Sequence, residues 1–152
     1  EKDLQNVDRV KTPWVILAGH RPMYCSAFAK RVVFVSLGMQ HQLEDLLYEY
    51  RVDLALWAHY HNYERTCALY QLKCVEDGIT HITIGTAGMD ENTMPYMKVE
   101  WSLFRRDHNS YGYGRVTVAN RSSLHWEYFV NNENKVVDDV WLTKTTRSDF
   151  LV

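Results

Sequence analysis

Three histidines follow two apolar segments of this chain. His20 lies in a Gly-His-Arg-Pro-Met-Tyr motif after the apolar run 13–18, and His59 and His61 lie in Ala-His-Tyr-His-Asn-Tyr-Glu-Arg after the run 52–57. Histidine is the commonest protein ligand for metal ions. Ligands of open α/β sheets gather beyond the carboxyl ends of the strands. If the two runs form neighbouring parallel strands, these imidazoles reach one edge of the sheet, and we predict a metal site there.

The spacing of the His-x-His pair strengthens this prediction. If the backbone stays extended, residues two apart point to the same side, so His59 and His61 would face one point or two adjacent ions. A single histidine in a loop is usually solvated or hydrogen-bonded. The pairing with His20 on the neighbouring strand is what favours a metal, and no role is assigned to the other four histidines, His41, His81, His108 and His125.

The first half of the chain predicts a parallel crossover unit. The continuous apolar run 13–18 is typical of a strand buried on both faces, and 52–57 predicts a second such strand. Between them, residues 39–50 have apolar side chains at helical spacing. The charged residues Glu44, Asp45 and Glu49 lie on the opposite side of this helix. The order strand, helix, strand indicates two parallel strands joined by a helix.

The second half predicts strands of another kind. Residues 80–85 alternate as a strand, and residues 89–110 are mixed and polar, which predicts a long loop. The segments 114–119, 123–130 and 135–142 then indicate an antiparallel meander, with Asn131-Asn132-Glu133-Asn134 as a hairpin turn. We therefore expect an α/β fold, a mixed sheet with an antiparallel edge, in a single domain spanning residues 1–152.

The composition and net charge limit the classes of binding partner that we expect for this chain. The chain has 152 residues, 46% of them hydrophobic, and a formal net charge of −2. This charge gives no reason to expect nucleic acid or an anionic membrane as a partner, and no apolar run approaches the roughly 18 residues of a membrane span. The chain starts at Glu1 without a signal-peptide pattern, so we expect it to be processed or cut from something longer.

Three cysteines and one acceptor motif favour an oxidising, secretory environment. Cys67 and Cys74 flank a short loop that they can close as a disulfide. Cys25 would then be free, or paired outside the chain. Asn120-Arg121-Ser122 is a glycosylation acceptor pattern. We therefore expect a glycoprotein that is secreted, or retained in the secretory pathway or the vacuole or lysosome.

The order of these motifs resembles one known family. Gly-His-Arg-Pro-Met-Tyr, followed some forty residues later by His-x-His-Asn-Tyr-Glu-Arg-Thr-Cys, is similar to the C-terminal part of purple acid phosphatases, a branch of the calcineurin-like metallophosphoesterases. The likeness covers about residues 3–144. It continues through five later motifs, namely Ile84-Gly85-Thr86-Ala87-Gly88, Trp101-Ser102, Tyr111-Gly112-Tyr113-Gly114-Arg115, Asn120 to Tyr128, and Val136-Val137-Asp138 to Trp141.

The resemblance implies an α/β/β/α sandwich that hydrolyses phosphate monoesters at a dinuclear centre of Fe(III) with divalent Fe, Zn or Mn. By motif position, His20 and His59 would bind the divalent ion, and His61 the Fe(III). In such centres the ions hold the phosphate, lower the pKa of a bound water and stabilise developing charge. Imidazole is a suitable ligand for these metals.

The upstream ligands of the family are missing from this chain. The Gly-Asp-x-Gly, Gly-Asp-x-x-Tyr and Gly-Asn-His motifs, which supply two aspartates, a tyrosine and an asparagine, do not occur. Three neutral imidazoles cannot complete two six-coordinate ions. We therefore expect an enzyme segment that is inactive alone, lacks its N-terminal half, and has room for a single divalent ion.

Local departures from the family pattern concern the active-site loop. Ala58 replaces the usual glycine before His-x-His, which distorts the loop only if its φ is positive. The segment Ala29-Lys30-Arg31 has no histidine where some relatives carry a proton donor, so the catalytic acid is unknown. Lys30 or Arg31 can bind phosphate or be solvated, and Arg21 can form a structural ion pair.

If the N-terminal half is missing, apolar parts of the sheet should be exposed. One half of a sandwich would leave an apolar sheet edge or face uncovered. The aromatic residues Tyr63, Trp126 and Trp141 are interpreted as core or as support behind the ligands.

Two other classes of function remain open at this stage. The first is a non-catalytic module that binds a metal or phosphate through its histidines. The second, less favoured, is a carbohydrate- or protein-binding domain, suggested by the aromatic residues of 111–141.

Overall fold

The computed structural model describes residues 1–28, 30–89, 95–106 and 111–144. Its helical segments are α1 (Lys2–Gln5), α2 (Lys30–Met39), the π-helix η1 (Gln40–Glu44) and α3 (Asp45–Glu49). The strands are β1 (Ile16–Gly19), β2 (Leu54–Trp57), β3 (Tyr63–Tyr70), β4 (Lys73–Cys74), β5 (Ile79–Ile84), β6 (Ser102–Arg106), β7 (Gly112–Val118), β8 (Ser123–Val130) and β9 (Lys135–Thr143). No helix among these residues is long and apolar enough to span a membrane.

The larger sheet is mixed, as predicted. Its strand order is β1-β2-β5-β3-β4, and β6 pairs with β3. Strands β1, β2 and β5 are parallel, whereas β3, β4 and β6 pair antiparallel. The register places Gly19 opposite Trp57, so β1 and β2 end side by side. The predicted crossover unit is therefore confirmed.

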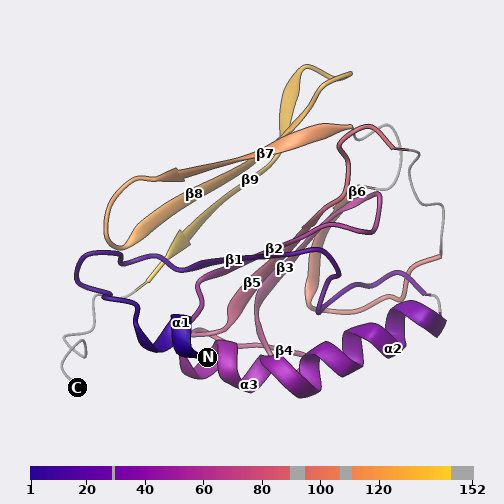
Figure 1. Cartoon of the computed structure of the whole chain (residues 1–152). Helices are drawn as coiled ribbons and strands as arrows, with labels where there is room; N and C mark the ends of the chain where they lie inside the picture. Colours follow the sequence, from indigo (N-terminus) through magenta and orange to yellow (C-terminus); the bar gives the residue numbers. More distant parts are fainter. Residues whose placement is uncertain (29, 90–94, 107–110, 145–152) are drawn as a thin grey trace.

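The C-terminal meander forms a second layer. Strands β7, β8 and β9 make an antiparallel sheet that lies over one face of the larger sheet (Figure 1). The buried core between the two sheets contains seven residues, Leu54, Tyr63, Ile82, Leu124, Trp126, Tyr128 and Val130. Burial alternates along β8, with Leu124, Trp126 and Tyr128 buried. This alternation is expected of a strand with one face against the core and one outside.

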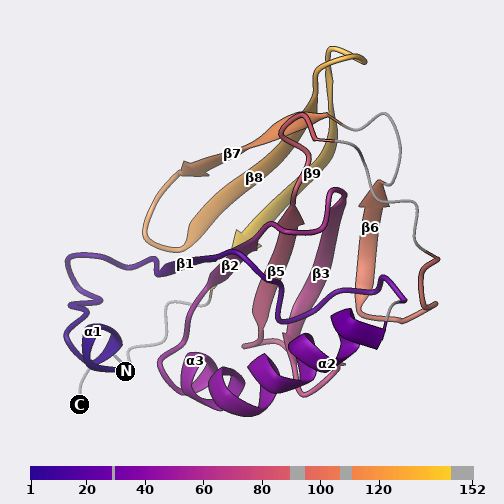
Figure 2. The same ribbon diagram turned by 45° about the vertical axis from the view of Figure 1, so that its right-hand side comes forward.

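The helices cover the opposite face of the larger sheet. Figure 2 shows α2 and α3 running along that face. Strand β2 contributes to both layers: Leu54 packs towards the meander, whereas Ala55 and Trp57 pack with Leu47 beneath the helices. This arrangement of two sheets with helices outside one of them is the expected C-terminal half of an α/β/β/α sandwich.

The helix differs from the prediction in its start and in a π-helical turn. Helical structure begins at Lys30 rather than near 39, and η1 interrupts it at 40–44. A π-turn changes the phase of the residues around it relative to an α-helix. Glu44, predicted on the polar side, is consequently buried and accepts hydrogen bonds from the Tyr24 hydroxyl and, at 2.8 Å, from the Gln71 amide.

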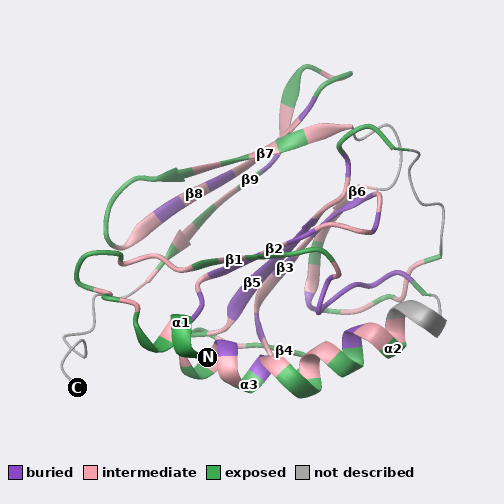
Figure 3. Cartoon of the chain, viewed as in Figure 1, coloured by how far each residue is buried: buried purple, intermediate pink, exposed green. Residues whose placement is uncertain are grey.

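The burial of strand β1 also differs from the prediction. The run 13–18 was expected to form a strand buried on both faces, but β1 is an edge strand whose Ile16 is 40% exposed. Figure 3 shows most of β1 as exposed. Nothing among the described residues pairs with its outer edge. The outer edge of β1 is therefore an uncovered sheet edge within the described residues.

Three smaller expectations were also wrong. The predicted loop 89–110 contains β6, which pairs with β3. Strand β5 does not alternate, because five of its six residues are buried and both of its faces are covered: Ile82 packs towards the meander and Ile79 towards the helices. Trp141 is 53% exposed on the outer face of β9, whereas Tyr63 and Trp126 are buried as predicted.

Candidate metal centre

The histidine motifs lie where the parallel strands end. His20 directly follows β1, and His59 follows β2 after one residue, Ala58. The Ala58 amide donates to the His20 carbonyl at 3.1 Å, which joins the two segments just beyond the sheet. The adjacent ends of two parallel strands therefore bring together ligands that lie 39 residues apart in the chain.

The imidazoles of His20 and His59 face one another. His20 Nε2 lies 3.0 Å from His59 Nδ1, and the ring centroids are 4.9 Å apart with the planes at 77°. The other nitrogen of His59, Nε2, lies 2.9 Å from Nη1 of Arg21. Arg21, for which the sequence left an ion pair open, thus contacts a predicted ligand.

The backbone bends within the His-x-His motif. His59 has φ +63°, and residues 59–62 form bends rather than a strand. The assumption that an extended backbone points His59 and His61 to one side was therefore wrong. Ala58 does not have a positive φ, so the alanine in place of glycine does not strain the loop.

Gly85 makes room for this bend. A Cβ added to Gly85 would lie 1.8 Å from the carbonyl oxygen of Tyr60. The Gly85 amide also donates to the Asn62 carbonyl at 3.0 Å. A side chain at position 85 would therefore displace the histidine loop from the end of β5.

His61 does not join the His20–His59 pair as a third close ligand. Among the described residues, the one group of three histidine, cysteine or acidic side chains with ligand atoms all within 4.8 Å lies elsewhere. His61 was predicted to bind a different ion from the pair. The ligand roles of all three histidines remain predictions.

The pair fits a divalent ion. Nitrogen ligands lie about 2.0–2.1 Å from zinc. With 3.0 Å between them, His20 Nε2 and His59 Nδ1 could both reach one ion at such a distance. Imidazole nitrogens suit zinc and iron. These two residues can therefore occupy neighbouring positions around one ion.

A buried carboxylate supports the loop from behind. Glu64, the first strand residue after Tyr63, accepts hydrogen bonds from the Ser26 amide at 3.0 Å and the Ser102 hydroxyl at 2.5 Å. Arg105 donates to the Ser26 hydroxyl at 3.2 Å and lies over the Tyr96 ring at 3.6 Å. Glu64 therefore ties the segment after His20 to the segment after His61.

Sequence reasoning gave Glu64 and Asn62 no role. Asn62 is buried and donates to the Tyr96 hydroxyl at 2.8 Å, and its Oδ1 has no hydrogen-bond partner within the described part of the chain. The available signal was two polar side chains on either side of Tyr63, directly after the His-x-His motif. Buried polar groups are normally hydrogen-bonded, so such residues indicate an internal network.

Two buried titratable groups lie beneath the site. Burial lowers the pKa of His81 to about 3, so its neutral ring accepts a hydrogen bond from Trp57 Nε1 at 3.0 Å. Burial, and secondarily Glu64, raises the pKa of the Cys25 thiol to about 12. Cys25 is therefore a neutral thiol at ordinary pH and does not offer a thiolate ligand.

A second polar cluster lies on the outer face of the meander. His125 Nε2 lies 2.9 Å from Asp139, its Nδ1 lies 3.7 Å from Glu127, and its ring stacks on Trp141. Arg115 donates to both Glu127 oxygens. The ligand atoms of His125, Glu127 and Asp139 lie within 4.8 Å of one another, but the Arg115 guanidinium already occupies both Glu127 oxygens.

The predicted disulfide and glycosylation residues lie outside the histidine motifs. Cys67 and Cys74 are bonded at 2.06 Å, and Cys25 is free. Asn120 lies exposed in the turn between β7 and β8. Residue 29 and the side chains of Lys30 and Arg31 lie outside what the structure describes, so their phosphate-binding role stays a prediction.

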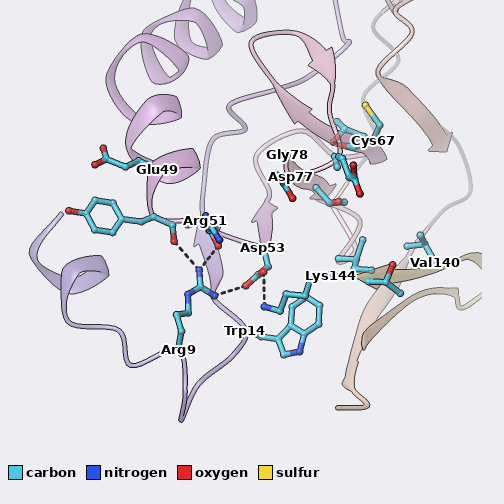
Figure 4. Close-up of a pocket in the computed structure, with 18 of the residues that line it drawn as sticks. Arg9, Trp14, Glu49, Arg51, Asp53, Cys67, Asp77, Gly78, Val140 and Lys144 are labelled. Atoms are coloured by element: carbon cyan, nitrogen blue, oxygen red, sulfur yellow. Dashed lines mark hydrogen bonds and ion pairs between the residues drawn. The ribbon is translucent and has the colours of Figure 1, made fainter. Parts of the chain in front are cut away.

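A cavity of about 770 Å³ lies at the other end of the larger sheet, beside the amino ends of β1 and β2. Figure 4 shows Asp53 between Arg9 and Lys144, at 2.8 and 2.9 Å. Asp53 also accepts from the Val15 amide at 2.7 Å. These charged groups bind one another and hold the chain before β1, and the cavity is separate from the histidine pair.

Comparison with known proteins shows that the class of this chain is that of the calcineurin-like phosphoesterases. The model of that class, "Calcineurin-like phosphoesterase", matches residues 1–63. The model "Iron/zinc purple acid phosphatase-like protein C" matches residues 78–139. The chain belongs to the purple acid phosphatase family.

Individual relatives agree with this assignment. The chain is 36% identical to acid phosphatase type 7 of Homo sapiens, over 95% of this chain and 38% of that protein. It is 38% identical to probable purple acid phosphatase 20 of Arabidopsis thaliana, over 94% of this chain and 34% of that protein. The solved purple acid phosphatase PPD1 of yellow lupin aligns with 99% of this chain and 28% of its own, with a TM-score of 0.80 and 30% identity. The chain thus spans less than half the length of these relatives.

Proposed function

We propose that this chain is the histidine-bearing part of a metal-dependent acid phosphatase that hydrolyses phosphate monoesters. The dinuclear Fe(III)–M(II) centre, in which M is Fe, Zn or Mn, would be completed by residues of a longer protein. The main observation behind this proposal is that His20 Nε2 and His59 Nδ1 lie 3.0 Å apart at the ends of two adjacent parallel strands. Family membership supports the same reaction class.

The proposal gives each histidine a distinct part. His20 and His59 hold the divalent ion through the two nitrogens that face one another, and His61 holds the Fe(III). The bound ions would supply Lewis-acid stabilisation of the phosphate and a bound water of lowered pKa. The contribution of this chain is orientation, because β1 and β2 fix the two imidazoles and Glu64 fixes the loop that carries His61.

We infer that the chain alone is inactive. Three neutral imidazoles leave the positive charge of two ions without anionic ligands. Among the described residues, no group of three histidine, cysteine or acidic ligands includes His20, His59 or His61. The family's aspartate, tyrosine and asparagine motifs are absent from the sequence. Two metals therefore need ligands from a polypeptide outside this chain.

A secretory or vacuolar-lysosomal location is part of the same proposal. The Cys67–Cys74 bond supports an oxidising environment. The exposed position of Asn120 supports glycosylation. Mass spectrometry of the protein from its native source would test both modifications.

The alternative function is a module that binds a metal ion but catalyses no reaction. Both members of the His20–His59 pair lie within this chain, so a module that binds one divalent ion through them, without turnover, is the alternative. The two proposals agree on the ligands of that ion. They differ in whether a completed protein turns over phosphate esters.

Zinc titration of the chain by calorimetry tests the ligand assignment. We expect one zinc ion to bind the wild type, and His20→Ala and His59→Ala each to weaken binding at least tenfold, because each removes one of two imidazoles. His41→Ala is the matched control, since His41 is exposed on η1. Equal affinity in all four proteins would refute the assignment.

An activity assay tests the need for the missing half. With iron and zinc present at acid pH, we expect no turnover of p-nitrophenyl phosphate by the chain alone. Addition of a polypeptide that carries the two Gly-Asp motifs and the Gly-Asn-His motif should restore turnover. Substantial turnover by the chain alone would refute the ligand argument, and zinc binding without turnover in the completed protein would favour the module.

A further inference from the structure

Two exposed aromatic side chains lie on the outer face of the C-terminal meander. The meander packs on the larger sheet through one face, so its other face points outward (Figure 1). Tyr113 of β7 is 52% exposed on that outer face, and Trp141 of β9 is 53% exposed. Trp126 and Tyr128 of β8, in contrast, are buried between the two sheets. The aromatic residues of the meander are therefore divided between the core and an open face.

The strand register arranges the outer face in rows. Residues directly opposite one another in paired strands share a face, and successive rows on that face are two residues apart. Tyr113 pairs with Phe129, and their ring centroids lie 5.3 Å apart. Trp141 pairs with His125, and these rings stack at 4.4 Å with their planes 7° apart. Because Phe129 lies four positions after His125 on β8, the two ring pairs are roughly 13 Å apart.

A row of polar side chains lies between the two ring pairs. It consists of Arg115, Glu127 and Asp139, one from each strand of the meander. Arg115 donates to both oxygens of Glu127 at 2.8 and 2.9 Å, and Asp139 lies 2.9 Å from Nε2 of His125. The side chains of Arg115 and Asp139 are nevertheless 60% and 58% exposed. A guanidinium and a carboxylate have more hydrogen-bonding positions than these contacts use, so both can also bind hydroxyl groups.

The order of ring pair, polar row and ring pair fits an extended oligosaccharide. A hexose presents C–H groups on the faces of its ring and hydroxyl groups around its edge. The C–H faces pack on aromatic rings, and charged planar groups form strong hydrogen bonds with the hydroxyls. β-1,4-linked hexoses form an extended chain, and both ring pairs lie along one strand, β8. The outer face can therefore contact several sugar units of one chain.

The charges on this face disfavour two other classes of ligand. The core of a protein–protein interface is depleted of charged residues, whereas here the charged row lies at the centre of the face. Nucleic acids and other polyanions are bound by a surplus of cations. In this row one arginine, Arg115, accompanies two carboxylates, those of Glu127 and Asp139. The face therefore suits an uncharged ligand that is rich in hydroxyl groups.

We propose that the outer face of the meander binds an uncharged, extended oligosaccharide that is a separate molecule. Trp141 and Tyr113 stack on its sugar rings, and Arg115 and Asp139 bind its hydroxyl groups. Glu127 holds the guanidinium of Arg115 in place. This site is additional to the histidine pair, and its existence does not depend on the proposed phosphatase function.

Calorimetric titration with two uncharged hexasaccharides, cellohexaose and chitohexaose, tests the proposal. We expect the chain to bind at least one of them, and Trp141→Ala and Tyr113→Ala each to weaken that binding about five- to tenfold, because each removes a stacked ring. Trp141→Phe, which keeps a ring, should retain most of the affinity. Phe34→Ala is the matched control, since Phe34 is an exposed aromatic residue of α2. Absence of binding, equal affinity in all variants, or tighter binding of a sulfated heparin hexasaccharide would overturn the proposal.

Two measurements on the same proteins show where the sugar binds and whether the face instead binds protein. In ¹⁵N NMR of the indole groups, the hexasaccharide should shift the signal of Trp141 and leave that of the buried Trp126 in place. The reverse pattern would place the sugar elsewhere and overturn the proposal. Sedimentation of the wild type and of the double variant Tyr113→Ala/Trp141→Ala should give the same mass. Self-association that only the wild type shows would identify the face as an interface between copies, against the proposal.

A glycan attached to the protein itself is the other source of the same chemistry. Asn120, the predicted glycosylation site, lies in the turn between β7 and β8. The wild type and Asn120→Gln, both produced in a glycosylating host, should therefore bind the hexasaccharide equally. Binding by Asn120→Gln alone would mean that the attached glycan occupies the face, and would overturn the proposal of a separate ligand.

Discussion

At residue 58, alanine replaces a glycine that the family usually carries, and the structure explains why this is tolerated. The bend of the histidine loop lies at His59, which has φ +63°, whereas Ala58 does not have a positive φ. Glycine permits a positive φ at low cost, but nothing at position 58 requires that freedom.

Restoring the family residue should therefore give no benefit. We expect Ala58→Gly to lower the free energy of unfolding by about 0.4–1 kcal/mol, because glycine increases the conformational entropy of the unfolded chain. Zinc affinity should stay within about twofold if the loop geometry is kept. Urea unfolding and calorimetry measure both quantities. A more stable Ala58→Gly variant would show that alanine strains the loop.

His81 makes the chain sensitive to acid. Its pKa is about 3 in the folded protein because the ring is buried against Trp57, whereas an exposed histidine titrates near 6.5. As the pH falls below about 6.5, the unfolded chain takes up the proton first. The stabilisation by neutral His81 is therefore complete above pH 6.5 and is lost towards pH 3, at up to about 1.4 kcal/mol per pH unit.

His81→Gln tests this assignment, because the glutamine oxygen can still accept the hydrogen bond from Trp57. Urea unfolding at pH 7 and pH 5 should show a smaller loss of stability in His81→Gln than in the wild type. His41→Gln is the matched control, since His41 is exposed. An unchanged pH dependence in His81→Gln would mean that another group dominates acid sensitivity.

At the scale of elements, the hairpin β3–β4 is fastened to the helices at the end of the sheet away from the histidines. The Tyr70 hydroxyl donates to Asp45 at 2.9 Å, and the Tyr70 ring stacks on Tyr48 with centroids 3.9 Å apart. The Gln71 amide donates to the buried Glu44. The Cys67–Cys74 bond closes this hairpin over a sequence separation of 7 residues.

Replacement of both cysteines by serine should therefore affect stability and leave the metal pair unchanged. Closing a loop of this length stabilises a protein by roughly 2–3 kcal/mol through the entropy of the unfolded chain. We expect a loss of that size in urea unfolding. A drop in zinc affinity beyond twofold would contradict the view that the hairpin and the histidine site are independent.

The elements also show how far the sequence predicts this fold. Apolar runs and helical spacing were sufficient to predict β1, β2 and the helix between them, because these patterns are local. The π-turn at 40–44 was not, since it depends on how Glu44 meets Tyr24 from a distant loop. Strand β6 was missed because its Leu103 is 55% exposed and its arginines give no alternating pattern.

The candidate site was predictable to the same extent. The ends of β1 and β2 placed His20 beside His59, because parallel neighbouring strands end together. The bend at His59, the contact of Arg21 and the support by Glu64 were not predictable. Each depends on a side-chain or loop geometry that only the packed molecule sets.

For the whole molecule, one buried network joins the two sheets. Arg65 of β3 donates to both oxygens of Asp138 on β9, at 2.7 and 2.8 Å. The Tyr63 hydroxyl donates to the same carboxylate at 2.6 Å and accepts from Trp126 at 2.8 Å. Burial, together with Asp138, raises the pKa of Tyr63 well above its usual value, so this phenol remains a donor. The meander is therefore attached to the strand that follows the histidine loop.

Asp138→Asn should destabilise the chain strongly. Removing one partner of a buried ion pair leaves the other charge uncompensated, which costs roughly 3–5 kcal/mol. Thermal or urea unfolding measures the loss. Glu127→Gln is the control, because its partner Arg115 is mostly in solvent. Replacement of both Arg65 and Asp138 by apolar residues should cost less than Asp138→Asn alone. A larger loss in the double variant would contradict this account.

The central claim is that His20 and His59 together bind one divalent ion, and X-ray absorption at the zinc edge of the zinc-loaded chain tests it most directly. We predict two imidazole nitrogens at about 2.0–2.1 Å, with oxygen ligands completing the shell. The imidazole count should fall to one in His59→Ala and stay at two in His41→Ala. A shell without imidazole, or one that His59→Ala leaves unchanged, would contradict the account.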